Sequence, residues 1–144
     1  MFSNIVVAVD GSEHAAHAIA TACDIAGKYD SNIHLVHSPQ VDTVGFAVGS
    51  GAYVLEPGPE RIKAAGQKVM DEAATLSKKQ GRAPKTTTIG NGDPAKEILN
   101  CAEANDADLI VMGRRGLGTM GNLFLGSVSG KVSHETTCAC LTVK

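Results

Sequence analysis

Residues 5–13 read IVVAVDGSE, and this stretch decides the fold. The run Ile5–Val9 is apolar and rich in β-branched residues, which predicts a buried β-strand. Asp10 ends the run, and Gly11 and Ser12 favour a turn followed by a helix N-cap. A helix is therefore expected from about Glu13 to Lys28. A short strand that turns directly into a helix is the first half of a βαβ unit.

The rest of the chain repeats this alternation of apolar runs and helical patterns. Further strands are expected at Asn32–His37, Lys85–Ile89, Asp108–Met112 and Thr137–Val143. Further helices are expected at Glu60–Lys79, Asp93–Ala104 and Ser127–Glu135. Such alternation predicts an α/β fold with helices on both faces of a parallel sheet. We expect one domain, residues 1–144, with a doubly wound, Rossmann-like five-stranded parallel sheet of order 3-2-1-4-5.

The helical periods also predict which side chains face the sheet. In the first helix the inward stripe is expected to be Ala15, Ala18, Ile19, Ala22 and Ile25. In the second helix it is expected to be Ile62, Val69, Ala73 and Leu76.

The composition narrows the class of protein. The chain is 43% hydrophobic and 19% charged, and its formal net charge of -2 comes without a long basic run, so nucleic-acid binding is not expected. A signal peptide and a run of membrane-spanning length are both missing from the pattern, which predicts a cytoplasmic protein without a membrane partner. The cysteines are then expected to be reduced, and Cys138-x-Cys140 lacks the spacing of a zinc knuckle.

The segment Ser38–Pro59 has no clear period and is rich in glycine and proline, so we expect a long loop. Its apolar residues suit either a lid or a partner surface. A merely mobile loop is an equal alternative.

The expected strand order places a binding crevice in the fold. The winding of the sheet reverses between the first and fourth strands, and open α/β sheets bind ligands beyond the carboxyl ends of strands at such a reversal. Ala8–Ser12 and Gly113–Ser129 should therefore form opposite walls of one crevice. Asp10 stands on the first wall, where it could hold ribose hydroxyls or a metal that bridges phosphates. Alternatively, Asp10-Gly11-Ser12 is only a turn and a helix cap.

The second wall carries the pattern G-x2-G-x9-G-S, formed by Gly113, Gly116, Gly126 and Ser127. Glycines allow the backbone to approach phosphate oxygens closely, and a helix that starts at Ser127 offers free N–H groups and a favourable dipole. The hydroxyls of Ser127 and Ser129 would add donors.

Two other phosphate motifs overlap this wall by chance. Gly116–Gly121 spells G-x-G-x-x-G, but the βαβ unit and the acidic residue that a dinucleotide site requires do not follow. Gly121-x4-Gly126 is followed by Ser127 where a P-loop requires lysine.

At this point the sequence resembles the universal stress protein family, and within it the ATP-binding branch. The resemblance runs through IVVAVDGSE, LVHS, NGDPAKEI, DLIVMGRRG, LGSVS and CACLTVK. It implies a fold similar to the adenine nucleotide α-hydrolases, with Ala8 and Asp10 at the adenosine and the Ser38 backbone at the adenine. The chain departs from the family pattern at Ala139, where proline is frequent, and at the pair Arg114-Arg115, where a histidine or a single basic residue is frequent.

The candidate nucleotide-binding residues are Ala8, Val9, Asp10, Ser38, Met112, Gly113, Arg114, Arg115, Gly116, Gly118, Gly126, Ser127, Val128 and Ser129. Asp10 is the candidate metal ligand, for Mg or Mn. The ligand implied is ATP, with AMP or ADP as alternatives.

These features predict an ATP-binding regulatory protein of the stress response. Bound nucleotide would order the glycine-rich loop and change a surface that a protein partner recognises, with slow hydrolysis or none. The chain is expected to form a homodimer through Thr137–Val143, which ends the sheet. Two alternatives stay open: a dimeric interaction protein that needs no nucleotide, and an enzyme of similar architecture that transfers or hydrolyses nucleotides.

Overall fold

The fold is built around a parallel pair of strands that lie far apart in the chain. A computed structural model describes residues 1–40, 44–48, 51–55, 58–116 and 125–144, with the backbone alone for 44–48 and 51–55. Strand β1 (Asn4–Ala8) pairs in parallel with β2 (Asn32–His37) on one side and with β6 (Leu109–Gly113) on the other. In this register Val7 lies opposite both Leu35 and Val111.

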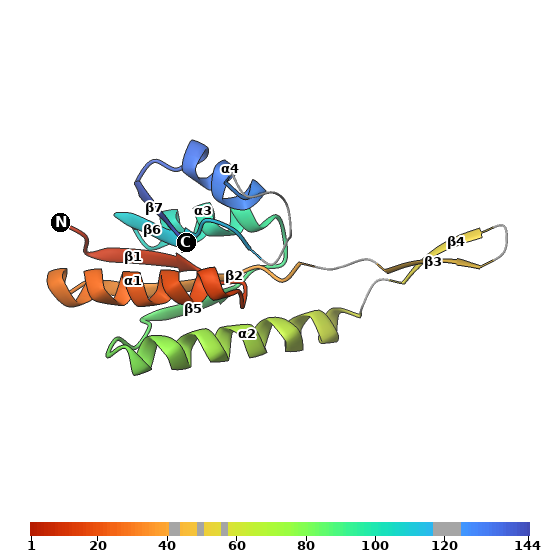
Figure 1. Ribbon diagram of the computed structural model, residues 1–144, viewed down its shortest axis with the longest axis horizontal. Helices are drawn as coiled ribbons and strands as arrows, with labels where there is room; N and C mark the ends of the chain where they lie inside the picture. The colour runs from red at the N-terminus through yellow and green to blue at the C-terminus, as the bar shows by residue number, and fades with distance from the viewer. Residues whose placement is uncertain (41–43, 49–50, 56–57, 117–124) are drawn as a thin grey trace.

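Two further strands complete the five-stranded sheet. Strand β5 (Thr86–Ile89) pairs with β2, and β7 (Ala139–Val143) pairs with β6, both in parallel (Figure 1). The order β5-β2-β1-β6-β7 is 3-2-1-4-5 when these strands are numbered along the chain. The predicted strand order is therefore confirmed, with its reversal of winding between β1 and β6.

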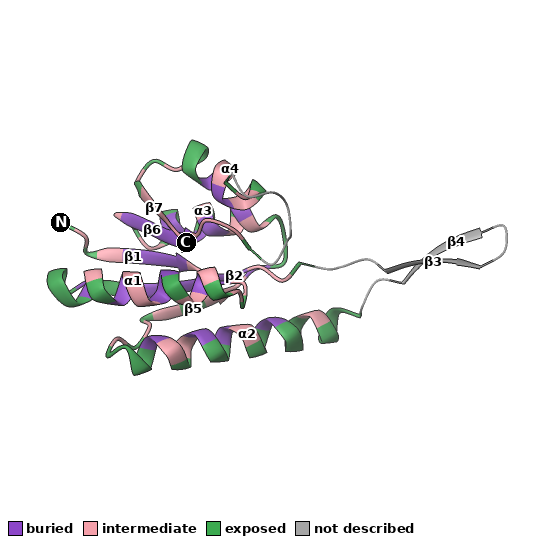
Figure 2. Ribbon diagram, viewed as in Figure 1, coloured by how far each residue is buried: buried purple, intermediate pink, exposed green. Residues whose placement is uncertain are grey.

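Helices cover both faces of the sheet, as predicted. Helices α1 (Glu13–Tyr29) and α2 (Pro59–Lys79) pack on the face that carries Ile5 and Val7. Helices α3 (Pro94–Ala104) and α4 (Ser127–Glu135) pack on the face that carries Val6. Figure 2 shows the buried residues concentrated in the strands and on the inner sides of these helices. Within the described part of the chain, no helix has the length and apolarity needed to cross a membrane.

The starts of α1 and α3 follow the predicted capping signals. Ser12 Oγ accepts the Ala15 N–H at 3.2 Å, and Asp93 Oδ1 accepts the Lys96 N–H at 3.1 Å. Pro94 occupies the first turn of α3, where its missing N–H costs no hydrogen bond.

The boundaries of the predicted elements agree with the observed ones to within two residues. The predicted strand over 137–143 starts only at Ala139, because Thr136 Oγ1 accepts the Cys138 N–H at 3.3 Å and holds a turn there. Strand β1 ends at Ala8, yet the Val9 N–H still donates to Val36 O at 2.9 Å, so the ladder reaches the predicted end.

The expected irregular loop between β2 and α2 is wrong. The segment contains an antiparallel hairpin of β3 (Val44–Val48) and β4 (Gly51–Leu55). Its sequence holds the signal: Val44, Phe46 and Val48 alternate with small residues, and the dipeptide Gly49-Ser50 is typical of a two-residue hairpin turn. The glycine content of the segment concealed this alternation.

The predicted inward stripe of α2 is wrong by about one residue. Of its members only Ala73 is buried. The other residues of α2 that bury most deeply are Gly66, Met70 and Ser77. Gly66 explains the rotation, since a Cβ there would lie 2.7 Å from Pro39 Cγ and 3.3 Å from Ile89 Cγ2. The helix therefore approaches the sheet through its glycine and leaves Val69 and Leu76 half-buried.

A histidine is buried in β2 in its neutral form. His34 is 2% exposed, with Nδ1 2.8 Å from Thr86 Oγ1 and Nε2 3.3 Å from Asn4 Oδ1. Both contacts are satisfied when the Thr86 hydroxyl donates to Nδ1 and the Nε2–H donates to Asn4. Burial, and secondarily the positive charge of Lys85, lowers the pKa of His34.

This burial predicts that acid destabilises the fold through His34. Because the pKa is lower in the folded than in the unfolded chain, the unfolded chain binds more protons below its own pKa of about 6.5. The stabilisation is therefore complete above that pH and is lost as the pH falls through the folded pKa. Urea denaturation from about pH 7 to about pH 5 should show a smaller loss of unfolding free energy for His34→Gln than for wild type. The exposed His134→Gln is the control, and equal slopes for all three proteins would refute the prediction.

Candidate functional site

The pairing of β1 with β6 brings the two predicted walls together. Ala8 lies opposite Met112 in the parallel register, so the segments that follow these residues leave the sheet at the same edge. Ala8, Val9 and Asp10 lie on one side, and Gly113, Arg114 and Arg115 on the other. Asp10 of the first wall therefore meets Gly116 of the second, whereas residues 117–124 of the second wall, which include Gly118, lie outside the described residues.

Asp10 uses its two carboxylate oxygens differently. Oδ1 accepts the N–H of Ser12 at 2.9 Å, which is the turn expected if Asp10 only shapes the start of α1. Oδ2 faces the second wall, because a Cβ added to Gly116 would lie 2.5 Å from it. The turn interpretation thus accounts for one oxygen and leaves the other directed across the crevice.

Gly116 is the glycine of the motif that borders this carboxylate. Any side chain at position 116 would collide with Asp10 Oδ2, so the close approach of the walls requires glycine. The approach of the two walls at this point therefore depends on the absence of a side chain at residue 116.

Gly113 and Gly126 have packing reasons of their own. A Cβ on Gly113 would lie 2.7 Å from His14 Cβ, against the first turn of α1. A Cβ on Gly126 would lie 3.3 Å from Arg114 O. Gly126 N also donates to Arg114 O at 3.0 Å, which brings the start of α4 against the end of β6. The backbone packing of the second wall therefore requires these two glycines, whether or not a ligand binds.

The buried side chain of Ser129 also holds the start of α4 against the end of β6. It is 3% exposed, and Oγ lies 2.8 Å from Arg114 O and 3.1 Å from Gly126 O. Its single O–H donates within the protein, so the predicted role of Ser129 as a hydroxyl donor to phosphate is not favoured by this geometry. Ser127, by contrast, is exposed at the first position of α4.

The N-terminus of α4 offers N–H groups at the crevice. Gly126 is the N-cap residue, and no described side chain caps the helix. The N–H groups of the first turn have no partner within their own helix, and the helix dipole adds partial positive charge there. This end of α4 suits an anion such as a phosphate group.

The paired arginines add positive charge beside this helix end. The Arg114 N–H donates to Val143 O at 2.6 Å, which fixes the backbone of Arg114 against β7. The Nε atoms of Arg114 and Arg115 are shielded from solvent and find no hydrogen-bond partner in the described ranges. Shielded guanidinium donors without partners are costly, and an anion would relieve that cost.

Sequence reasoning missed His37, which joins the ends of β1 and β2. The ring is 7% exposed, and Nδ1 lies 2.7 Å from Val9 O. A carbonyl oxygen only accepts, so Nδ1 carries the proton and donates. The bond fixes the backbone immediately before Asp10. In the sequence, the one signal for this role is that His37 ends an apolar run that predicts a buried strand.

Ser38 lies at the same edge of the sheet but points away from the two walls. Its Oγ donates to Gly92 O at 2.8 Å, in the loop between β5 and α3. The side chain therefore serves this loop, and its backbone is the part left for a ligand.

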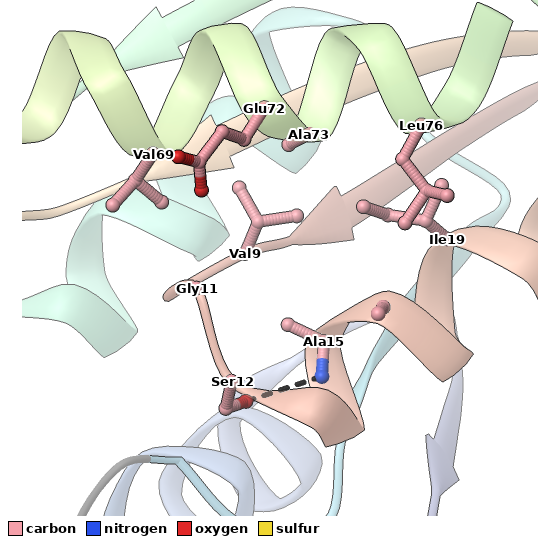
Figure 3. A pocket seen from close by; sticks show the side chains of 10 residues that line it. Val9, Gly11, Ser12, Ala15, Ile19, Val69, Glu72, Ala73 and Leu76 are labelled. Atoms are coloured by element: carbon pink, nitrogen blue, oxygen red, sulfur yellow. Dashed lines mark hydrogen bonds between the residues drawn. The ribbon is translucent and has the colours of Figure 1, made fainter. Parts of the chain in front are cut away.

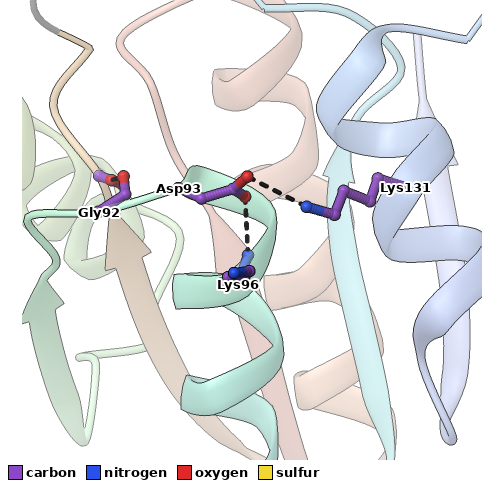
Figure 4. A network of polar contacts seen from close by, with 5 residues as sticks. Gly92, Asp93, Lys96 and Lys131 are labelled. Carbon is purple, nitrogen blue, oxygen red and sulfur yellow. Dashed lines mark hydrogen bonds and ion pairs between the residues drawn. The ribbon is translucent and has the colours of Figure 1, made fainter.

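An ion pair bridges α3 and α4 at this edge, and sequence reasoning missed it as well (Figure 4). Asp93 Oδ2 lies 3.1 Å from Lys131 Nζ, while Oδ1 caps α3 through the Lys96 N–H. The Lys96 N–H first, and then Lys131, lower the pKa of Asp93. Both side chains of the pair are partly exposed, so the ion pair adds little to the stability of the fold. Its main effect is on the orientation of α3 relative to α4.

A metal site built by protein ligands alone does not emerge. Within the described residues, no three His, Cys, Asp or Glu side chains converge. Asp10 alone could supply one carboxylate oxygen to Mg or Mn, and such ions are commonly held by one or two carboxylates together with substrate phosphates.

Comparison with known proteins places the chain in a family. The family model described as universal stress protein family matches residues 1–144. A universal stress protein of Thermus aquaticus is 39% identical over 146 residues, and the universal stress protein YxiE of Bacillus subtilis is 34% identical over 149 residues. Each of these alignments covers 100% of both chains.

Solved structures share the fold. The universal stress protein of Archaeoglobus fulgidus in complex with dAMP has a TM-score of 0.73 at 23% identity and covers 99% of this chain and 98% of its own. A universal stress protein in complex with cAMP has a TM-score of 0.72 at 21% identity, covering 99% and 97%. A member from Arabidopsis thaliana with AMP bound has a TM-score of 0.65 at 21% identity, covering 99% and 91%.

The Ser129 hydroxyl predicts a stability difference between two serines of α4. Ser129→Ala removes a buried donor to Arg114 O and should lower the unfolding free energy by about 0.5–1.5 kcal/mol. Ser127→Ala, two residues earlier and exposed, should change it by less than about 0.5 kcal/mol. Urea denaturation followed by circular dichroism measures both, and equal effects would show that the Ser129 bond does not hold the wall.

Proposed function

The chain belongs to the universal stress protein family, and from this premise we propose that it binds an adenine nucleotide in the crevice between β1 and β6. ATP is the proposed ligand, with AMP and ADP as alternatives. The nucleotide acts as a signal: its binding changes a surface recognised by a partner protein in a stress response.

The observation that carries the proposal is the approach of Asp10 Oδ2 to Gly116. A carboxylate oxygen is an acceptor for ribose hydroxyls, and Asp10 Oδ2 is directed across the crevice toward the backbone of the second wall. The phosphates would then reach the N-terminus of α4 and the donors of Arg114 and Arg115. The adenine would lie toward Val9 and the Ser38 backbone. The structures of family members with dAMP, cAMP and AMP support this choice of ligand class.

The proposed site keeps the residues expected from the sequence, with one change of role. Ser129 shapes the wall instead of donating to phosphate. Val128 and Ser127 offer backbone N–H groups, and Met112 and Ala8 form the floor at the ends of β6 and β1. Mg or Mn would bind between Asp10 and the phosphates.

We propose that the nucleotide is held, with slow hydrolysis or none. Asp10 already accepts the Ser12 N–H through Oδ1, so one of its two carboxylate oxygens is engaged in the turn. His37 donates Nδ1–H to Val9 O and is buried. Neither group is poised to activate a water molecule.

A homodimer through β7 is part of the proposal. The strand lies at the end of the sheet, and the Ala139 N–H donates inward to Asp108 O while Val143 O accepts the inward Arg114 N–H. Because directions alternate along a strand, the N–H and C=O groups of Cys140 and Thr142 point outward. A second copy paired antiparallel would satisfy them.

A nucleotide-independent dimeric interaction protein is the second candidate. The packing of Gly113 against His14 and of Gly126 against Arg114 favours it, because both glycines have structural reasons that need no ligand. The two candidates differ in whether the purified protein binds ATP.

Nucleotide binding predicts that a side chain at position 116 blocks the site. Gly116→Val should weaken ATP binding by about tenfold or more, because the new side chain would occupy the position beside Asp10 Oδ2 that the ligand needs. Calorimetric titration of ATP, ADP and AMP with Mg measures this, and circular dichroism verifies the fold. Asp10→Ala should also weaken binding. If Asp10→Ala only lowers the melting temperature and leaves affinity unchanged, Asp10 serves the turn alone and its proposed role at the ribose is refuted.

The dimer predicts a selective effect of proline at position 142. Thr142→Pro removes an N–H that points away from β6, so a free edge tolerates it while a paired edge does not. Light scattering after size exclusion should give a dimer for wild type and for the control Thr142→Val, and a monomer for Thr142→Pro. A proline variant that stays dimeric would exclude β7 as the interface.

A further inference from the structure

A gap lies between α1 and α2, and Val9, Gly11 and Ser12 of the turn before α1 also line it (Figure 3). It arises from the rotation of α2 described above. Gly66 and Met70 face the sheet, so Val69 and Leu76 turn toward α1. The α1 side chains opposite them include the small Ala15 and Ala16, which are too short to fill the space.

The size of the gap limits what it can hold. Its volume is about 120 Å³. An apolar cavity of about 150 Å³ takes up benzene, so this space accepts a body of about one aromatic ring if part of the molecule stays at the opening. Val9 and Ile19 complete the apolar floor.

The charge at the opening selects the ligand class. Among the described residues that line the gap, Glu72 alone is charged, and its carboxylate is drawn toward the space above Val9 and Gly11 in Figure 3. The Ser12 Oγ that also lines the gap already accepts the Ala15 N–H. A cation is therefore favoured at the rim and an anion is disfavoured.

We propose that this gap binds a small organic ammonium ion. Its apolar body lies between Ala16, Val69 and Leu76, and its cationic nitrogen pairs with Glu72. The site takes amines that carry one ring or a short alkyl chain. Val9 borders both sites, but neither Asp10 nor the start of α4 lines the gap, so the proposal does not depend on nucleotide binding.

Methyl NMR of the full chain tests the proposal with benzylammonium as the probe and benzyl alcohol as its neutral counterpart. Saturable shifts should appear at the methyl groups of Ile19, Val69 and Leu76. The methyl groups of Val128, at the crevice, should not move. Benzylammonium should bind about two- to fivefold more tightly than benzyl alcohol, the ratio expected of one partly exposed ion pair, and added salt should reduce that ratio.

Two variants separate the apolar and the ionic contacts. Glu72→Gln should remove the preference for the cation and keep benzyl alcohol binding, whereas the exposed control Glu103→Gln should change neither. Ala16→Leu fills the gap and should abolish binding of both probes. Absence of saturable shifts, shifts centred on Val128, or equal binding of the two probes to wild type would each overturn the proposal. Since Glu72→Gln alters only an exposed side chain, it tests the ionic contact even if Ala16→Leu fails to fold.

Discussion

The parallel pairing of β1 with β6 is the contact on which the rest of the molecule depends. It joins residues about a hundred positions apart in the sequence, and it sets the point where the helices change from one face of the sheet to the other. Because both strands end at the same edge, Asp10 and Gly116 meet there without any long side chain to bridge them. The strand order determines where the crevice lies, and the loops supply the residues that line it.

At this edge of the sheet, the two walls are held mainly by hydrogen bonds to backbone carbonyl oxygens. Arg114 O accepts from both Gly126 N and Ser129 Oγ, and Val9 O accepts from His37. These bonds fix the walls within the protein itself, and such preorganisation would lower the entropic cost of binding the proposed nucleotide. The exposed Asp93–Lys131 pair adds orientation between α3 and α4 at the same edge.

The strand order, the helix caps and the meeting of the walls could be predicted because each follows from a local signal with a strong rule behind it. Ser12 and Asp93 cap helices as their residue types require, and right-handed crossovers determine the sheet order. Tertiary effects escaped the prediction. The rotation of α2 depends on Gly66 meeting Pro39 and Ile89, and the inward hydroxyl of Ser129 depends on where Arg114 O lies. The hairpin of β3 and β4 has a signal in the sequence, the alternation of large apolar and small residues, but the glycine content of the segment concealed it.

The turn from Val9 to Ser12 is a wall with two sides. Val9, Gly11 and Ser12 line the gap between the helices, while the Asp10 carboxylate between them faces the crevice. If both proposed ligands bind, a group that shifts this turn from one side would alter the affinity on the other, and thermodynamic linkage would make the effect reciprocal, by the same factor in each direction. One small molecule would then report on another through a single turn of backbone.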